Sequence, residues 1–203
     1  MDVARRSRAG IRLLAVRARG FLTLVLVVAA VPVLSACGER TMHAADANNN
    51  GTYINAGPLT YQLQISRELN QYLPSDAGYM IGLPKAALKL SPTQLWFGVF
   101  LWAKNETNRI YRTTDNFDLV DTQGNVYRPL KLNPTVNQFA WTAQTLAPGD
   151  TEPTPNTTAA NGASGGKLLL FKLNASIYDN RPLSLEIRAP SGDRVWATMS
   201  LDL

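Results

Sequence analysis

Apolar and polar residues alternate in short stretches after residue 53, which is the pattern of β-strands with one buried face. The predicted strands lie at residues 59–65, 95–103, 117–121, 126–127, 167–173, 183–187 and 195–203. Asp121-Thr122-Gln123-Gly124 has Asp first and Gly fourth, as in a type I turn, and Ser191-Gly192-Asp193 separates the last two strands. Short strands at this spacing predict an all-β fold, an immunoglobulin-like antiparallel β-sandwich of about seven strands.

Two long segments separate the predicted strands. Residues 67–94 are rich in apolar side chains and include a helix-like stretch, Pro84–Lys89, with Pro at a plausible first position. We expect this segment to be ordered. Residues 148–166 are rich in Pro, Thr, Ala and Gly, and we expect them to be mobile.

The strand at residues 95–103 is apolar on both faces. Its two faces carry Leu95, Phe97, Val99 and Leu101 on one side and Trp96, Phe100 and Trp102 on the other. A sandwich strand normally buries one face only, and large exposed apolar patches are unusual, so the second face needs a cover. One explanation is that residues 67–94 fold over it, through Leu69, Tyr72, Leu73, Tyr79, Met80 and Ile81.

The other explanation is a partner-binding surface, because Trp and Tyr are frequent interface hot spots. The candidate binding residues are then Arg67, Glu68, Asn70, Tyr72, Trp96 and Trp102. Replacing both tryptophans by Ser would separate the two explanations, through lost folding or through a lost partner.

The N-terminus has the features of a secretory signal: six arginines against Asp2 in the first twenty residues, then an apolar run at residues 21–31. This run is short of the roughly 20 residues that span a bilayer. Leu34-Ser35-Ala36-Cys37 resembles the lipobox of bacterial lipoproteins, in which the cysteine is lipidated and the chain is cut before it. We predict a signal peptide at 1–36, a lipidated flexible tether at 37–52 and one domain at 53–203. The alternatives are an ordinary signal peptide or an uncleaved anchor.

The net charge of +5 belongs to the predicted leader. Removing its six arginines and one aspartate leaves 14 basic and 14 acidic residues, so nothing in the charge suggests a nucleic-acid partner. Cys37 is the only cysteine and His43, in the tether, the only histidine. A Ser/His or Cys/His catalytic site is therefore disfavoured, and we expect no cofactor.

No metal site is expected either, because zinc and copper sites need clustered His, Cys or Met. Calcium would need converging oxygens, yet Asp118 points away from Asp115 and Asp121 if all three lie on one strand. We therefore expect a protein that is not an enzyme.

Several turn and core positions resemble a known family. They are Asn105, Phe117-x-Leu119-x-Asp121-x-x-Gly124-x-x-Tyr127, Leu146-x-Pro148-Gly149, Leu170-Phe171 and Leu183-x-Leu185. This pattern is similar to the uncharacterised immunoglobulin-like domains of secreted bacterial lipoproteins, sometimes labelled telomeric-repeat-binding-factor-like. The resemblance implies a β-sandwich outside the cell membrane and implies no reaction.

These observations predict a lipoprotein anchored through Cys37 at the extracytoplasmic face of the bacterial membrane. We expect a non-enzymatic protein-binding or accessory module whose ligand the sequence does not identify, with an envelope protein as one candidate partner. The alternative is a small-ligand or metal-binding lipoprotein of an envelope transport system. A flat aromatic patch would favour the first function, and a concave pocket with converging polar groups the second.

Overall fold

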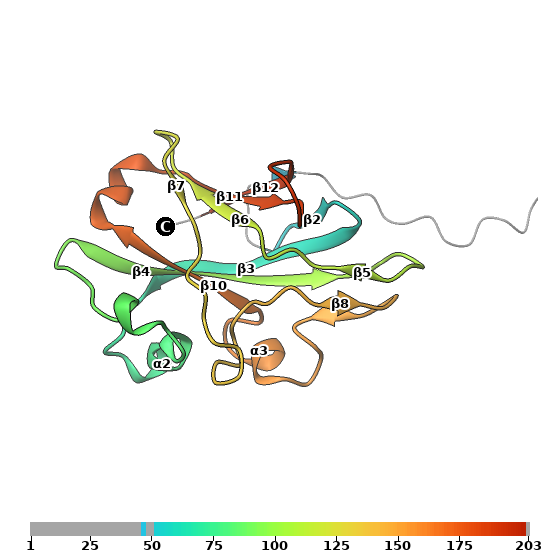
Figure 1. The fold of residues 1–203 in the computed structure, drawn as a ribbon, viewed down its shortest axis with the longest axis horizontal. Helices are drawn as coiled ribbons and strands as arrows, with labels where there is room; N and C mark the ends of the chain where they lie inside the picture. Colours follow the sequence, from blue (N-terminus) through green and yellow to red (C-terminus); the bar gives the residue numbers. More distant parts are fainter. Residues whose placement is uncertain (1–45, 48–50, 202–203) are drawn as a thin grey trace, which may run out of the picture. The chain divides into compact units, whose positions relative to one another are not determined.

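Two β-sheets face each other across an apolar core in the part of the chain that this computed structural model describes, residues 46–47 and 51–201 (Figure 1). The strands are β1 (Asp46–Ala47), β2 (Tyr53–Ala56), β3 (Leu59–Leu69), β4 (Gln94–Lys104), β5 (Tyr111–Arg112), β6 (Phe117–Val120), β7 (Val126–Tyr127), β8 (Thr145–Leu146), β9 (Thr151–Glu152), β10 (Lys167–Asn174), β11 (Leu183–Arg188) and β12 (Val195–Leu201).

One sheet has the strand order β1–β12–β11–β6–β7 and the other β10–β4–β3–β2, with β9 also beside β4. Strands β5 and β8 form a separate two-stranded ribbon. All pairs are antiparallel except β1 with β12. The predicted all-β sandwich architecture is confirmed.

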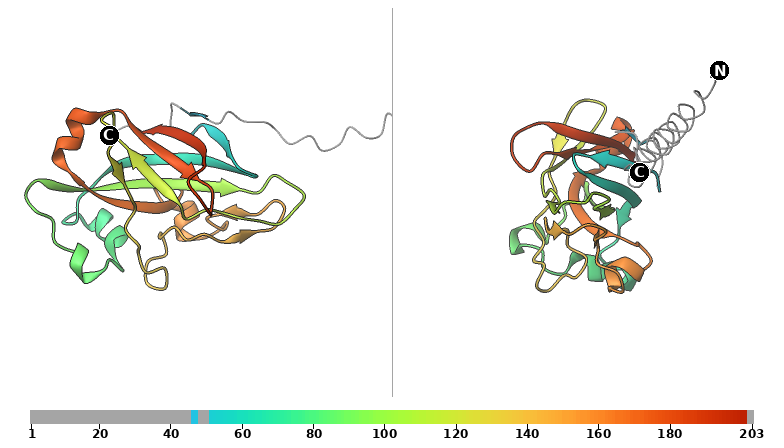
Figure 2. Two further views of the ribbon diagram at one scale, coloured as in Figure 1. Left: turned by 45° about the horizontal axis from the view of Figure 1, so that its top comes forward. Right: turned by 90° about the vertical axis from the view of Figure 1, so that its right-hand side faces the viewer.

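Short helices lie outside the strands: α2 (Pro74–Ala77), η2 (Gly78–Met80), η3 (Lys85–Ala87), α3 (Thr158–Asn161) and η4 (Ala175–Asn180). Figure 2 shows α2 and α3 on the side of the β3–β4 sheet that faces away from β11 and β12. The helix-like pattern at 84–89 is thus one 3₁₀ turn, closed by the Ala87 N–H donating to the Pro84 carbonyl at 2.8 Å.

The main core fills the space between the two sheets. Alternate residues of β4, from Leu95 to Leu101, pack there against β11 and β12 residues such as Leu185 and Met199, all at most 5% exposed. This face of β4 follows directly from the period-2 pattern of the sequence.

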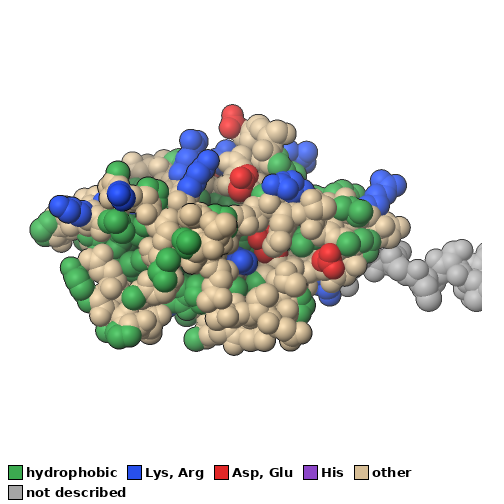
Figure 3. All heavy atoms as spheres, turned by 60° about the horizontal axis from the view of Figure 1, so that its bottom comes forward, with side chains coloured by type: hydrophobic (Ala, Val, Ile, Leu, Met, Phe, Trp, Pro, Cys, Tyr) green, Lys and Arg blue, Asp and Glu red, His purple; other side chains and the backbone are tan. Residues whose placement is uncertain are grey.

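The other face of β4 is covered, as the first explanation predicted. Trp96 and Phe100 lie in a second apolar cluster with Leu69, Tyr79 and Met80 from the 67–94 segment. The rest of the predicted cover is wrong, because Tyr72, Leu73 and Ile81 are 84%, 49% and 51% exposed. Residues 130–139 supply the remainder, through Leu130, Leu132 and Phe139. Seen from this side, exposed apolar side chains form several separate groups (Figure 3).

The expectation that residues 148–166 are mobile is wrong. β9 extends the sheet beside β4, with Glu152 opposite Ala103. Ser164 is buried, and its hydroxyl lies 2.7 Å from the hydroxyl of Tyr79. Backbone pairing and a buried hydrogen bond therefore hold a segment whose composition suggested a loop.

The predicted tether is partly wrong as well. Asp46 and Ala47 form β1, paired with Thr198 and Met199 of β12. The chain therefore enters the sheet at Asp46, seven residues before the predicted start of the domain at Tyr53. Cys37 and His43 lie outside the described residues. Among the described residues, no helix is long and apolar enough to cross a bilayer.

The turn after β6 is built around Asp121. The Gly124 N–H donates to the Asp121 carbonyl at 3.0 Å, as a β-turn requires, and Gly124 has a positive φ of 80°. Burial alone would raise the pKa of the Asp121 carboxyl, but hydrogen bonds from Asn125, Tyr127 and Asn180 lower it to about 2. The carboxylate oxygens of Asp121 therefore accept hydrogen bonds within and beside the turn.

No group of three or more His, Cys, Asp or Glu residues in the described ranges could hold a metal ion.

Candidate ligand-binding cleft

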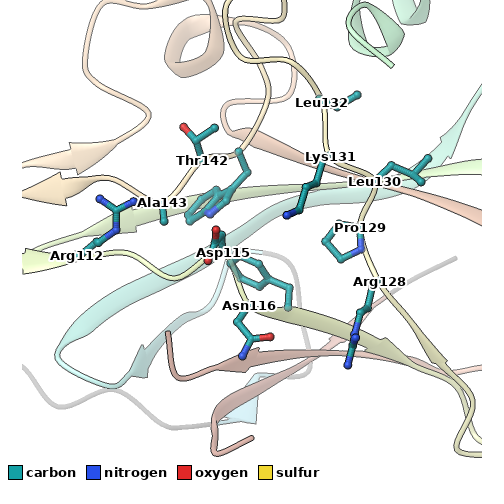
Figure 4. A pocket seen from close by; sticks show the side chains of 12 residues that line it. Arg112, Asp115, Asn116, Arg128, Pro129, Leu130, Lys131, Leu132, Thr142 and Ala143 are labelled. Atoms are coloured by element: carbon teal, nitrogen blue, oxygen red, sulfur yellow. The ribbon is translucent and has the colours of Figure 1, made fainter. Parts of the chain in front are cut away.

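A cleft of about 370 Å³ lies where three successive segments between residues 112 and 143 meet (Figure 4). Its walls are Arg112 with 115–117, residues 128–132 after β7, and residues 141–143 before β8. The volume lies within the usual range for small-molecule sites, about 300–1,000 Å³.

The base of the cleft is aromatic. The rings of Phe117 and Trp141 meet edge to face, with centroids 5.4 Å apart and planes at 88°. The Trp141 indole N–H donates to the Thr114 carbonyl at 2.8 Å, which fixes the orientation of the ring. Tyr61 of β3 lies 6.0 Å from Trp141, centroid to centroid, and supports it from within the core.

Hydrogen bonds hold two of the walls together. The Thr113 N–H donates to the Gln144 carbonyl at 2.9 Å, and the Gln144 N–H donates to the Thr113 hydroxyl at 2.9 Å. The Thr114 N–H donates to the Tyr61 hydroxyl at 3.3 Å. Because Thr113 and Thr114 are fully buried, the residues on either side of them, Arg112 and Asp115, start from a fixed backbone.

The rim of the cleft is mainly basic. It carries Arg112, Arg128 and Lys131 against one acid, Asp115. Arg128 forms an ion pair with the buried carboxylate of Asp118, at 3.3 Å between Nε and Oδ1. By contrast, the side chains of Arg112 and Lys131 have no hydrogen bond or ion pair within the described ranges. In Figure 4 the Lys131 side chain extends across the cleft toward Asp115.

Glu152 belongs to β9, opposite Ala103 of β4, and does not line the cleft. It is completely buried, and its Oε2 accepts a hydrogen bond from the Thr113 hydroxyl at 2.9 Å. Oε1 makes no hydrogen bond with the described residues. Burial raises the pKa of Glu152 to about 7, although hydrogen bonding from Thr113 and Gln144 and the charge of Lys167 act in the opposite direction.

The candidate binding residues predicted from sequence lie elsewhere. Arg67 makes a two-pronged ion pair with Asp76, at 2.6 and 3.1 Å, and Asp76 is 2% exposed. This pairing lowers the pKa of Asp76 and fixes the cover segment. Glu68 accepts a hydrogen bond from the Tyr178 hydroxyl. Asn70 accepts one from the Tyr72 N–H at 2.9 Å, which leaves the Tyr72 side chain projecting from the turn.

The two tryptophans predicted to contact a partner, Trp96 and Trp102, differ in burial. Trp96 is 1% exposed and donates to the Gln71 side chain at 3.2 Å, so it is a core residue and the prediction that it contacts a partner is wrong. Trp102 is half-buried and packs edge to face on Tyr53, with centroids 5.9 Å apart. None of the six predicted residues lines the cleft.

Sequence reasoning assigned none of the cleft residues to a binding site: Asp115 was considered only as a calcium ligand, and Phe117 only as a strand and family-pattern position. The one local signal is Phe139-Ala140-Trp141, an aromatic pair in an otherwise polar stretch before Leu146. Such a pair in a predicted loop indicates that the loop packs on the sandwich. It does not indicate which basic residues meet it there.

No family model and no curated protein matches the chain, so the family resemblance stays a prediction. Solved structures with a similar fold include the yjhA protein of Bacillus subtilis, 12% identical over 79% of this chain and all of that one, with a TM-score of 0.45. The ycdA protein of Bacillus subtilis, named as a candidate lipoprotein, is 11% identical over 76% of this chain and 38% of that one, with a TM-score of 0.45. An uncharacterised β-sandwich protein from Clostridium difficile is 10% identical over 81% of this chain and 99% of that one, with a TM-score of 0.40.

Proposed function

We propose that the protein is a membrane-anchored extracytoplasmic lipoprotein that binds a small ligand in the cleft. One observation carries the ligand-binding part: three successive segments place an aromatic base and two basic side chains around one cavity, and neither of these basic side chains has a partner among the described residues. Concave sites with a few converging polar groups are typical of small-molecule binding. The second aromatic face of β4, which would have favoured a protein partner, is buried at Trp96 and Phe100.

The proposal is binding without catalysis and without a metal. Cations and aromatic rings hold and orient a ligand, whereas acid–base or nucleophilic chemistry needs a positioned base. The basic rim would repel a metal cation. The membrane anchor is proposed because Leu34-Ser35-Ala36-Cys37 resembles a lipobox. Two or more acyl chains on Cys37 would hold the protein firmly on the membrane, whereas one chain would not.

The anchor is tested by replacing Cys37 with Ser in the full chain expressed in a bacterial host. We expect the protein to lose incorporated fatty acid and to move from the membrane pellet to the soluble fraction. Thr41→Ser, a conservative change outside the lipobox, is the control and should stay in the pellet. If Cys37→Ser remains membrane-bound and acylated like the control, the lipid anchor is refuted.

Ligand binding is tested by filling the cleft. Full-length protein purified from its own envelope is analysed by native mass spectrometry for small molecules that stay bound. Ala143 lines the cleft and is half-buried, so Ala143→Trp should abolish the bound species. Ala147→Trp, at an exposed position outside the cleft, should retain it. An identical bound species in both variants, or none in the unaltered protein, would count against the proposal.

A second proposal, that the protein also contacts an envelope protein, is favoured by the exposure of Tyr72. Its side chain is 84% exposed, and the neighbouring Leu73 is 49% exposed. A photoreactive phenylalanine at 72 should crosslink one defined protein in the native envelope. The same label at exposed Thr122 should not, and equal labelling from both positions would refute this surface.

A further inference from the structure

The charges around the cleft do not cancel. Asp118 and Glu186 together face Arg128 and Arg188, with Asp118 to Arg188 at 2.8 Å and Glu186 to Arg188 at 2.5 Å. Two acids and two bases make this group neutral, so Arg128 adds little net charge to the cleft.

What remains is Arg112 and Lys131 against Asp115, an excess of one positive charge. Neither base has an ion-pair partner in the described part of the chain. Figure 4 shows Arg112 and Asp115 on one wall and Lys131 on the facing wall. A group with one negative charge would complete the balance.

The rest of the lining is apolar on one side. Pro129, Leu130 and Leu132 lie on the wall that carries Lys131, and Ala143 lies on the wall across from it. These side chains are partly buried, Leu130 and Leu132 against the second apolar cluster, and a bare inorganic ion would leave their remaining exposed surface in contact with water. A ligand with an apolar body would bury them and gain roughly 25 cal/mol per Å² of apolar surface removed from water.

We infer that the cleft binds a small amphiphilic anion, with its acidic group between Arg112 and Lys131 and its apolar body along Pro129 and Leu130. This inference rests on the proposed function and adds the chemical class of the ligand. An Arg guanidinium and a Lys ammonium together suit a carboxylate, sulfonate or phosphate monoester. Asp115 then acts against the anion and limits its charge to about one.

The test uses 2-naphthoate as the anionic probe and 2-naphthamide as its neutral counterpart, titrated into the full-length protein by calorimetry. We expect naphthoate to bind at least tenfold more tightly than naphthamide, and inorganic phosphate to bind more weakly than naphthoate. The naphthoate affinity should fall several-fold between 50 and 500 mM salt, because salt screens exposed charges.

Three variants, each lacking one charge, show whether Arg112, Lys131 and Asp115 strengthen or weaken naphthoate binding. Lys131→Gln and Arg112→Gln should each weaken naphthoate binding about five- to tenfold, because each removes an attractive charge near the rim. Asp115→Asn should strengthen it by a similar factor, because it removes a repulsive one. Exposed Lys85→Gln, far from the cleft lining, is the control and should leave binding unchanged. Thermal unfolding of every variant confirms that it is folded.

The outcomes separate this inference from the proposed function. If naphthamide binds as tightly as naphthoate, or if Asp115→Asn weakens binding, the ligand is not an anion, yet the cleft still binds small molecules. If neither probe binds and no small molecule is captured from the envelope, the proposed function itself fails. Vesicles containing phosphatidylglycerol distinguish the source: competition with naphthoate would identify a lipid, and its absence a soluble acid.

Discussion

Replacing Trp96 by Ala is expected to lower the free energy of unfolding by about 3–5 kcal/mol. Trp96 is 1% exposed and belongs to the cluster that joins β4 to the cover segment, so alanine leaves a large cavity there. The surrounding side chains, Phe100 and Leu168 among them, come from β-strands that are hydrogen-bonded to their neighbours and cannot collapse freely into the space. Urea denaturation followed by far-UV circular dichroism measures the loss.

Trp102 is the matched control, because it lies on the same face of β4 six residues further along. It is half-buried and its main aromatic contact is the exposed Tyr53, so Trp102→Ala should cost only about 1 kcal/mol. Equal losses for both variants would contradict the burial difference. A stable Trp96→Ala protein that lost only a binding partner would restore the interface role predicted from the sequence.

A change of pH from 4.5 to 8.5 is expected to destabilise the protein by about 3 kcal/mol through Glu152 alone. Burial raises the pKa of Glu152 from its ordinary 4.5 to about 7 in the folded state. The folded protein therefore holds this proton more tightly than the unfolded chain does. The resulting stabilisation is complete at or below pH 4.5, falls as the pH rises through 7, and is absent above it.

The variant Glu152→Gln isolates this effect, because the amide is neutral at every pH and can still accept a hydrogen bond from Thr113. Its stability should be the same as or higher than that of the unaltered protein at pH 8.5, and the difference should vanish or reverse at pH 4.5. Lys167 and Tyr61 are the other titratable groups that interact with Glu152. Burial lowers the pKa of Lys167 and raises that of Tyr61, and both remain in the two proteins being compared.

Chemical denaturation at several pH values measures the difference between the two proteins. Asp193→Asn removes an exposed carboxyl group and should leave the pH profile of stability unchanged. Parallel pH profiles for Glu152→Gln and the unaltered protein would show that Glu152 ionises normally, and would contradict its burial.

The long strands β3, β4, β10, β11 and β12 were predictable because each buries a regular set of apolar side chains, and β6 and β7 were predicted as a hairpin. Strands β1, β2, β5, β8 and β9 were not predicted, since none has more than four residues. The double-faced apolar pattern of β4 also predicted a cover, and Leu69, Tyr79 and Met80 supply it. The cleft was not predictable, because its walls meet only after the segments around residues 115, 130 and 142 pack together. Before that, Arg112 and Lys131 look like any solvated surface charges.

The errors over residues 148–166 and over Asp46–Ala47 have a common physical cause. Both stretches have polar or small-residue compositions typical of loops, and both join the edge of an existing sheet. Backbone hydrogen bonds to a neighbouring strand need no particular side chain, so sequence patterns do not reveal them.

The pairing of β1 with β12 sets a limit on how far the domain could stand from a bilayer. Asp46 lies nine positions after Cys37, and an extended chain of that length spans at most about 30 Å. A tether that ran free to Thr52 would have reached roughly 50 Å. Under the proposed anchor, the domain would work within a shallow layer next to the headgroups. Its ligand would be met at the membrane surface, and a partner on the far side of a wide envelope would be out of reach.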